Sequence, residues 1–488
     1  MPLPEVLRPR APAALDRREF LRLSAFAAAG LALDPKPLAR RGPPRRIVIL
    51  GAGLAGLSAA LQLSEAGHDV VVLEAQRRPG GRVLTLREPF SDGLYAEAGA
   101  GRIPETHNLT LHYVKQFGLE LEPFYPSRGK SVLSVRGRRI PYTKLEEVDM
   151  SAVTLDLSAE DRRIGLAGLD AKYVAGLLHR LGDIEASGWP PPALAGIDRM
   201  SFAEFLYQSG ATPDTAAFLA LGFEKTSALD SLRDATHHHT KTLSKIRGGN
   251  DRLPKAFAAR LSRVIRYGCP VVAIRQGTDS VEAVVESAAG EREGVRGDLM
   301  ICTIPFTVLR KIPVEPAFPS YKSGVIDSLS SGSVTRIELQ TRRRFWEDRG
   351  ENGFATIDRP MEIWNPSWDQ PGPRGLLQAY VYEDLARRVC AEDEASRIRF
   401  ALETLEKVHP GLAKNFEGGV AKCWDEDPWA RGAYTLYMPG QLSNGWPELI
   451  AKPEGRIHFA GEHVSPYPGW IQGALWSGLR AADAVNGR

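Results

Sequence analysis

Cysteine is scarce in this chain, with four residues among 488 and no CxxC pair. Small disulfide-bonded scaffolds need a higher density of cysteine, and zinc ribbons and thioredoxin-like dithiols need cysteines paired at that spacing. The sequence therefore excludes all three classes. The run of His237, His238 and His239 lacks a spaced carboxylate or cysteine partner, so we interpret it as a solvated or helix-surface run and predict no metal site.

Long apolar runs and a large charge of one sign are missing as well. No apolar run reaches the roughly 20 residues that cross a bilayer, so we predict no stable membrane span. Basic residues outnumber acidic ones by only 62 to 59, and residues 1–46 hold ten of the basic and four of the acidic residues. The remaining chain is slightly acidic and gives no indication of nucleic-acid binding. The length predicts about three domains or lobes of an ordinary globular protein.

The N-terminal segment has the pattern of a targeting signal. The stretch Asp16-Arg17-Arg18-Glu19-Phe20-Leu21-Arg22 precedes an Ala-rich apolar run of 11 residues, 23–33. Paired arginines before a weak apolar run resemble a twin-arginine export signal, which addresses folded proteins to the export machinery. We therefore predict a periplasmic or secreted protein that is exported in the folded state. The alternative is a disordered basic N-terminus with a chance arginine pair.

A nucleotide-binding motif follows the leader. Residues 47–50 form an apolar run typical of a buried parallel strand, and Gly51, Gly53 and Gly56 come next at GxGxxG spacing. The first glycine permits a tight turn, the second lets a pyrophosphate approach the backbone, and the third lets helix and strand pack closely. A second strand ends at Glu74, which can accept a hydrogen bond from a ribose hydroxyl. Strand, glycines, helix, strand and acid in this order indicate a dinucleotide site.

Four further segments resemble the flavin amine oxidase family. They are the Arg-Arg-Pro-Gly-Gly-Arg turn at 77–82, the Gly-Cys-Pro-Val-Val stretch at 268–272, and two C-terminal segments at 456–463 and 468–474. The resemblance runs from about residue 47 to 488. It implies FAD as the cofactor and an α/β fold, with a three-layer, Rossmann-like FAD-binding domain and a discontinuous substrate domain of mixed sheet and helices.

The resemblance also implies where the domains and the flavin contacts lie. Residues 1–46 are the export signal and linker. The FAD-binding domain takes 47–103, 244–310 and 455–488, and the substrate domain takes the mostly helical 104–243 and then 311–454. The expected flavin contacts are Gly51, Gly53, Leu54, Ala55, Gly56, Glu74, Ala75, Gly81, Arg82, Gly99, Ala100, Gly101, Arg102, Val272, Gly461, Glu462, Gly469, Trp470 and Ile471.

Arg102 is the candidate substrate anchor. L-amino-acid oxidases have an arginine at the matching place that clamps the substrate carboxylate, whereas monoamine oxidases have none. A guanidinium fork fits a carboxylate through two parallel hydrogen bonds. The pair Trp364 and Asn365 stands about where snake-venom-type enzymes carry a second, carboxylate-binding tyrosine, so Asn365 or another tyrosine would take that role. The alternative is a surface arginine after a glycine-rich turn.

Tyr434 and Trp470 match the two aromatic walls that flank the amine path in the family. Such walls align a substrate over the flavin and exclude water. Together with Gly469 and Trp364 they complete the expected substrate-binding set, although both aromatic residues could instead be core packing. Ala433 stands where monoamine oxidases carry the flavin-linked cysteine, so we expect FAD to be bound noncovalently.

Arg336 matches a family lysine that holds a water near the flavin and assists the reaction with oxygen. Arginine keeps the charge but is bulkier. With Tyr434 and Trp470 it forms the expected catalytic set. It lies in 333–340, whose alternating pattern predicts a strand, as do 353–357 and 375–382. We expect these strands to form a sheet over the flavin, with Trp364 and Trp368 in a loop.

The resemblance implies an FAD-dependent L-amino-acid oxidase. The substrates would be an amino acid and molecular oxygen, and the products a 2-oxo acid, ammonia and hydrogen peroxide. A homodimer would be compatible with this activity. Three alternatives stay open from the sequence: an amine or polyamine oxidase, a decarboxylating amino-acid monooxygenase, and a flavin-stabilised binding protein without turnover.

Overall fold

The computed structural model describes residues 37–487. The expected export signal, including Arg17 and Arg18, lies outside the described residues. Within them, no helix combines the length and apolar character that a membrane crossing requires. The C-terminal part of the expected linker lies against the two helices α2 (Leu54–Glu65) and α16 (Ile471–Asn486), because Leu38 donates its N–H to Gln62 and Ala39 accepts from Asn486.

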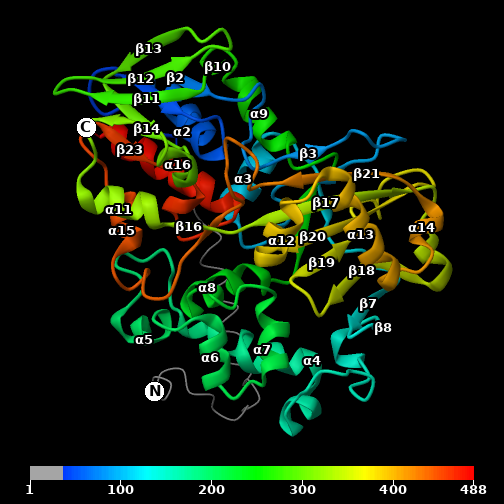
Figure 1. The fold of residues 1–488 in the computed structure, drawn as a ribbon. Helices are drawn as coiled ribbons and strands as arrows, with labels where there is room; N and C mark the ends of the chain where they lie inside the picture. The colour runs from blue at the N-terminus through cyan, green and yellow to red at the C-terminus, as the bar shows by residue number, and fades with distance from the viewer. Residues whose placement is uncertain (1–36, 488) are drawn as a thin grey trace.

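A parallel five-stranded sheet forms the centre of the upper lobe in Figure 1, with the order β10-β2-β1-β14-β23. Both ends of the chain and its middle contribute strands, and α2 and α16 pack against each other on this sheet. A second sheet, β13-β12-β11-β15, adds the third layer. The α/β prediction and its discontinuous topology are confirmed. The bounds are β1 Arg46–Leu50, β2 Asp69–Glu74, β10 Ile265–Tyr267, β14 Leu299–Cys302, β23 Ile457–Phe459, β11 Val271–Gln276, β12 Val281–Glu286, β13 Arg292–Gly297 and β15 Val314–Glu315.

A mixed seven-stranded sheet forms the second lobe, with the order β21-β17-β20-β19-β18-β7-β8. The strands β17 and β20 pair along their whole length inside the sheet, and all their residues are buried, including the polar ones that alternate along β17. Helices α12, α13 and α14 cover its outer face (Figure 1). The bounds are β21 Phe416–Cys423, β17 Val334–Thr341, β20 Gly375–Tyr382, β19 Met361–Trp364, β18 Glu351–Ile357, β7 Lys130–Val135, β8 Arg138–Tyr142, α12 Glu383–Cys390, α13 Glu394–Val408 and α14 Leu412–Asn415.

The third lobe is helical and lies below the two sheets in Figure 1. Its helices are short, and several begin at a side-chain cap; Ser201 and Glu204 form a complete capping box at the start of α6. A core of Leu, Ile and Phe side chains links this lobe to the parallel sheet. The bounds are α4 Ala159–Tyr173, η3 Ala175–Arg180, η4 Pro192–Leu194, α5 Ala195–Asp198, α6 Phe202–Gln208, α7 Pro213–Ala220 and α8 Ala228–His238.

Short elements complete the described chain. They are β3 Thr85–Leu86, β4 Ala96–Glu97, β5 Ile103–Pro104, α3 Asn108–Gln116, β6 Leu121–Pro123, η2 Leu145–Glu147, β9 Leu243–Ile246, α9 Arg252–Arg260, α10 Phe306–Leu309, α11 Ser320–Ser328, β16 Ser330–Ser331, η5 Phe345–Arg349, β22 Thr435–Leu436, α15 Trp446–Ala451 and η6 Glu462–Val464.

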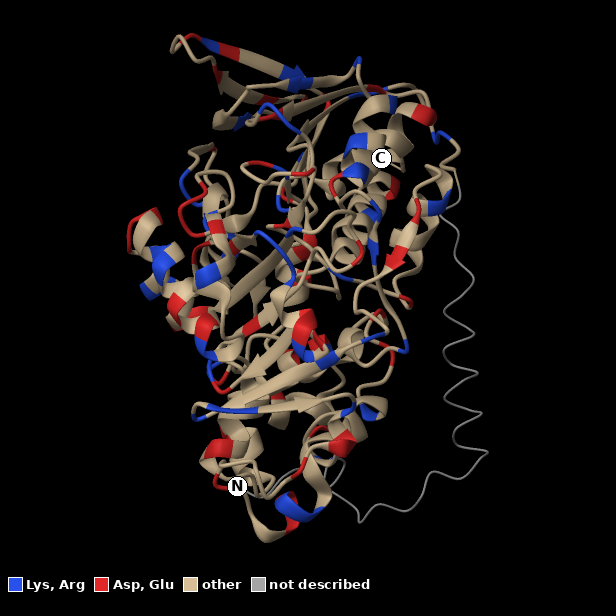
Figure 2. Cartoon of the chain, turned by 90° about the vertical axis from the view of Figure 1, so that its right-hand side faces the viewer, with Lys and Arg blue, Asp and Glu red and all other residues tan. Residues whose placement is uncertain are grey.

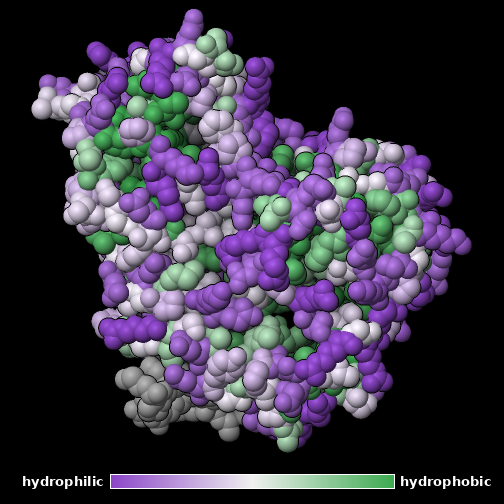
Figure 3. All heavy atoms as spheres, viewed as in Figure 1, coloured by the Kyte–Doolittle hydropathy of each residue, from purple (hydrophilic) through white to green (hydrophobic). Residues whose placement is uncertain are grey.

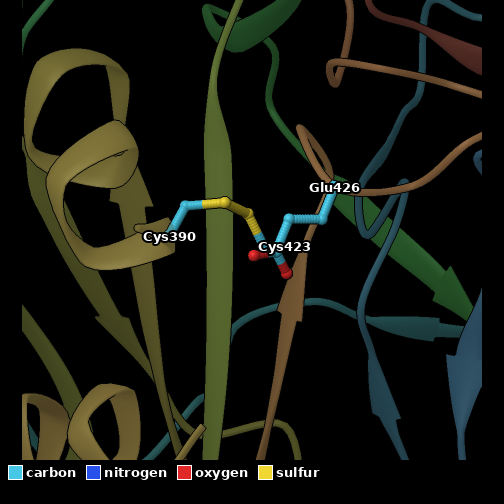
Figure 4. A group of neighbouring side chains, drawn as sticks. All are labelled: Cys390, Cys423 and Glu426. Atoms are coloured by element: carbon cyan, nitrogen blue, oxygen red, sulfur yellow. A yellow bond between two sulfur atoms is a disulfide. The ribbon is translucent and has the colours of Figure 1, made fainter. Parts of the chain in front are cut away.

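One disulfide joins the end of α12 to the end of β21. Cys390 and Cys423 have Cα atoms 5.7 Å apart, and the carboxylate of Glu426 lies beside them (Figure 4). This pair has no signal in the sequence, because the two cysteines are 33 residues apart and meet only through the folded sheet. Cys269 and Cys302 are free.

The surface carries both charges. Basic and acidic residues are interspersed over the elements in the view of Figure 2. The face in Figure 3 is mainly hydrophilic, and hydrophobic side chains gather at its upper left, over the region of β11, β14 and β23.

Candidate active site

A first cavity of about 160 Å³ lies at the carboxyl end of the parallel strands, where nucleotides bind in such sheets. Glu74 lies in its wall and already accepts two backbone N–H groups, from Ala52 at 2.7 Å and Gln76 at 2.8 Å. Burial raises the pKa of Glu74 despite these hydrogen bonds. The predicted flavin residues that line this cavity are Gly51, Gly53, Leu54, Ala55, Glu74, Ala75, Gly81, Arg82, Ala100, Gly461, Glu462, Gly469, Trp470 and Ile471.

The glycine-rich turn has the geometry that a bound phosphate needs. Gly51 has φ +104°, which favours glycine, and a Cβ placed on Gly53 would meet no atom within 4 Å and would extend into open space. A Cβ on Gly56 would lie 2.0 Å from the carbonyl oxygen of Gly51. The absence of a side chain at Gly56 therefore allows the helix to approach the turn closely. Gly56 itself does not line the cavity.

Val272 is the one predicted flavin residue in β11. Its neighbour Val271 lines the first cavity, while Val272 does not. The pairing of β11 with β12 shifts register between Val271 and Ala273, so Val272 lies at a bulge. Its contact with the flavin stays a prediction.

A salt bridge between Arg82 and Glu462 joins the two ends of the predicted flavin site. Arg82 donates to Glu462 at 2.8 Å and to the carbonyl of Ala433 at 3.0 Å. Glu462 also accepts from the N–H groups of Thr435 and Gly469. Burial would raise the pKa of Glu462, but Arg82 and the other partners outweigh it and lower the pKa. The network therefore keeps this carboxylate charged.

A second cavity of about 410 Å³ adjoins the first. The two share the lining residues Arg82, Ala100, Trp424, Gly469, Trp470 and Ile471. The second cavity lies between the seven-stranded sheet and the helical lobe, as its lining from both shows. The predicted residues that line it are Arg82, Gly99, Ala100, Gly101, Arg102, Arg336, Tyr434, Gly469, Trp470 and Ile471.

Arg102 lines this cavity with little exposure, at 14% for its side chain. Its Nη1 lies 3.8 Å from an Oε2 atom of Glu362, beyond hydrogen-bond distance, and its guanidinium lies 4.9 Å from the ring centroid of Trp364. The hydroxyl of Tyr125 also interacts with the guanidinium of Arg102. Burial opposes the charge, but Glu362 and nearby tyrosines raise the pKa of Arg102. Arg102 is therefore a permanent cation that retains donors for an anionic ligand.

Arg336 is buried and held on several sides. It donates to the carbonyl of Glu97 at 2.9 Å and to Gln378 at 3.0 Å, and its guanidinium lies 3.9 Å from the ring centroid of Tyr380. Its guanidinium also lies 4.8 Å from the ring centroid of Trp364. These contacts hold the charge at the sheet side of the second cavity.

The prediction that Trp364 lies in a loop is wrong, because it is the last residue of β19. It lines neither of the two large cavities, and its role in substrate binding stays a prediction. The ring is buried and supports Arg102 and Arg336 through cation–π contacts. Asn365 is buried as well and donates to the carbonyl of Asn352, so it does not face Arg102.

Tyr434 and Trp470 both line the second cavity. Tyr434 directly follows Ala433, whose carbonyl accepts a hydrogen bond from Arg82. Burial raises the pKa of the Tyr434 hydroxyl well above its ordinary value. Trp470 donates its indole N–H to Asp234 of α8 at 2.8 Å. Its ring therefore has a defined orientation at the junction of the two cavities.

The interpretation of the histidine run as solvated is wrong for its first member. His237 is 4% exposed, and its ring packs 5.2 Å from that of His107 and 5.6 Å from that of Trp470. Burial lowers the pKa of His237 to about 4 and that of His107 well below its ordinary value. Both rings are therefore neutral packing partners behind Trp470. His238 and His239 line the cavity.

Sequence reasoning missed several cavity residues: Glu362, Tyr380, Tyr382 and Asp234. The period of a strand could have found two of them, since Tyr380 and Tyr382 alternate along β20 and so share a face. Tyr382 donates to Glu362, and Tyr380 lies opposite Arg336 in the sheet register. For Glu362 and Asp234 the sequence carries no such signal.

The fold thus combines a cavity at the carboxyl end of a parallel sheet with a second, adjoining cavity between the seven-stranded sheet and the helical lobe. The model of the family "Flavin containing amine oxidoreductase" matches residues 54–486. The chain belongs to this family.

Relatives and solved structures extend the comparison. YobN of Bacillus subtilis (strain 168), which carries the name L-amino-acid oxidase as a provisional assignment, is 33% identical over 91% of this chain and 95% of its own. An L-amino-acid oxidase of Demansia vestigiata is 29% identical over 91% and 87%. Wild-type putrescine oxidase bound to putrescine has the same fold, with a TM-score of 0.77 at 22% identity over 91% and 100%.

Proposed function

We propose that this chain is an exported, FAD-dependent L-amino-acid oxidase. It converts an L-amino acid and oxygen to a 2-oxo acid, ammonia and hydrogen peroxide. The observation that carries the proposal is Arg102, a buried cation that faces the cavity adjoining the nucleotide site. The names of the relatives support the same substrate class.

Arg102, Tyr434 and Trp470 each have a role in the proposed reaction. Bound FAD would accept two electrons from the substrate and pass them to oxygen. Arg102 binds the α-carboxylate, and Tyr434 and Trp470 orient the substrate and exclude water. The open space at Gly53 and the Arg82–Glu462 salt bridge fit a noncovalently held dinucleotide, and Ala433 offers no thiol for a covalent link. No protein base is assigned, since in a neutral amine the nitrogen lone pair can form the C=N bond as the Cα–H would leave as a hydride to bound FAD.

A substrate panel tests the proposal. Purified holoenzyme is supplied with L-amino acids and with their decarboxylated amines, and hydrogen peroxide is measured. Peroxide with amino acids supports the proposal, whereas peroxide only with amines contradicts it. An amide product in place of the 2-oxo acid would identify a monooxygenase. Failure of every substrate to bleach the flavin under anaerobic conditions would favour a binding protein.

Amine oxidation is the second candidate function. The carboxylate of Glu362 lies 3.8 Å from Arg102 and lines the same cavity, so part of the positive charge is already compensated. An amine without a carboxylate would leave this pair undisturbed. The panel separates the two candidates directly.

Arg336→Lys should change the rate of flavin reoxidation by oxygen at least several-fold and change the reduction by substrate less. Lysine keeps the positive charge but replaces the guanidinium that donates to Glu97 and Gln378 with a smaller group, and charge at this place stabilises the negative charge that develops on oxygen. Stopped-flow absorbance times the two half-reactions separately. An effect confined to reduction by substrate would remove Arg336 from the reaction with oxygen.

Export is supported by the disulfide Cys390–Cys423, since such bonds persist mainly in oxidising compartments.

Replacing Arg17 and Arg18 together by lysine should leave nearly all activity in the cytoplasm, because the export machinery reads the paired arginines. Activity is assayed in separated compartments, with Arg22→Lys as the control that keeps the pair. Unchanged periplasmic activity in the double variant would contradict the twin-arginine assignment.

A further inference from the structure

The second cavity has acidic side chains on the side of the helical lobe. Asp234 of α8 and Asp170 of α4 both line it. His238 lies 3.2 Å from Asp234 and His239 lies 3.4 Å from Asp170. The side chains of Asp234 and Asp170 are 48% and 42% exposed, so neither carboxylate is enclosed by its histidine.

Asp234 has acceptor capacity left. One oxygen accepts from the indole of Trp470 at 2.8 Å and the other faces His238 at 3.2 Å, while an ionised carboxylate has about four acceptor positions. Its side chain is 48% exposed and lines the cavity. Burial would raise the pKa of Asp234, but His238 and the hydrogen bonds outweigh it and lower the pKa. Asp234 is therefore charged and open to a donor.

The groups behind this wall add no free positive charge. Burial keeps His237 and His107 neutral, as described above. Arg233 is buried, and its guanidinium is paired with Asp230 at 2.5 Å. The nearest cationic side chain on α8 is therefore already engaged with a carboxylate.

The seven-stranded sheet and the turn beside it bring cationic groups to the same cavity. Arg102 and Arg336 line it there, with Glu362 beside Arg102. A ligand that contacts both the sheet side and the helical lobe thus meets guanidinium groups on the first and carboxylates on the second. An amino acid with a cationic side chain has the matching arrangement, with its carboxylate at one end and its side-chain charge at the other.

We propose that the cavity selects L-amino acids with a cationic side chain, of the arginine and lysine type, and that Asp234 is the residue that determines this specificity. The proposal rests on the proposed function. Asp234 and Asp170 bind the guanidinium or ammonium of the side chain while Arg102 binds the α-carboxylate. Because Asp234 also holds Trp470, the same carboxylate links side-chain recognition to the aromatic wall.

The test compares L-arginine with L-citrulline, which has the same length and an uncharged urea group. The holoenzyme should show a kcat/KM at least about tenfold higher for arginine. Asp234→Asn should lower this ratio by roughly 10- to 100-fold, since its amide oxygen can still accept from Trp470 but brings no charge. Asp170→Asn should lower it by a smaller factor. Asp384→Asn, on α12 and paired with Lys225, is the matched control and should leave the ratio unchanged.

The outcomes separate this proposal from the proposed function. A ratio near one in the wild type, or an unchanged ratio in Asp234→Asn, overturns the specificity proposal while amino-acid oxidation stands. If no amino acid is oxidised, the proposed function fails, and agmatine against butylamine then provides the same comparison of charged and uncharged ends. A preference for agmatine that Asp234→Asn abolishes would still support Asp234 as the cation-binding residue. Equal loss for both members of a pair would assign Asp234 to the support of Trp470 alone.

Discussion

Gly53→Val should yield a folded, colourless protein that contains almost no flavin. A Cβ at this position meets no atom within 4 Å beyond its chain neighbours, so the fold leaves open space for a side chain to begin there. The two methyl groups would fill the space beside the turn where a pyrophosphate approaches the backbone. Backbone conformation is no obstacle, since Gly53 has φ −71° and ψ 172°. The loss therefore falls on the cofactor and not on the fold.

The measurement is the ratio of flavin to protein in the purified variant, together with its circular dichroism. Gly418→Val is the matched control, because a Cβ there also meets nothing within 4 Å and the residue lies in β21 and lines neither cavity. The control should be yellow. A yellow Gly53→Val protein with full flavin content would show that this turn does not bind the pyrophosphate.

The glycine-rich turn of the nucleotide half was predictable because its contacts are local in sequence. Gly51, Gly53 and Glu74 line one cavity, and the strands around them are buried apolar runs that the sequence shows directly. The interval from Gly51 to Glu74 contains a complete strand, turn, helix and strand unit. Here local pattern and tertiary position agree.

The substrate half was predictable only in part, because its side chains come from elements distant in sequence. Glu362 and Asp234 face one cavity from β19 and α8, and the sequence does not show that these elements meet. Trp364 was predicted to lie in a loop, but it is a buried strand residue. Its aromatic character alone is compatible with lining a substrate cavity or with packing beneath two arginines. From sequence alone, an acidic residue is expected on a solvated surface. Only the fold shows that Glu362 and Asp234 line a cavity instead.

Arg102→Ala should lower kcat/KM for amino acids by roughly 30- to 4,000-fold. Removing one partner of a buried charge pair costs about 2–5 kcal/mol, at about 1.4 kcal/mol per factor of ten. The corresponding amines should lose little, because they bring no carboxylate that needs a partner. They could even react faster, since the variant leaves Glu362 free to bind a cation. Arg102→Lys should recover only part of the loss, because an ammonium cannot form the planar fork.

The decisive quantity is the ratio of kcat/KM for one amino acid to that for its amine, measured in the wild type and in both Arg102 variants. Arg139→Ala is the matched control: Arg139 is also partly buried and bound to a carboxylate, Glu351, at 2.6 Å, but it lines neither cavity. Flavin content and thermal unfolding identify any loss that stems from an unpaired Glu362. If Arg102→Ala lowers both substrates equally, Arg102 supports the flavin-side turn and does not bind the carboxylate. If the wild type already prefers the amine, the charge pair with Glu362 is the functional state of Arg102, and amine oxidation replaces amino-acid oxidation as the function of this cavity.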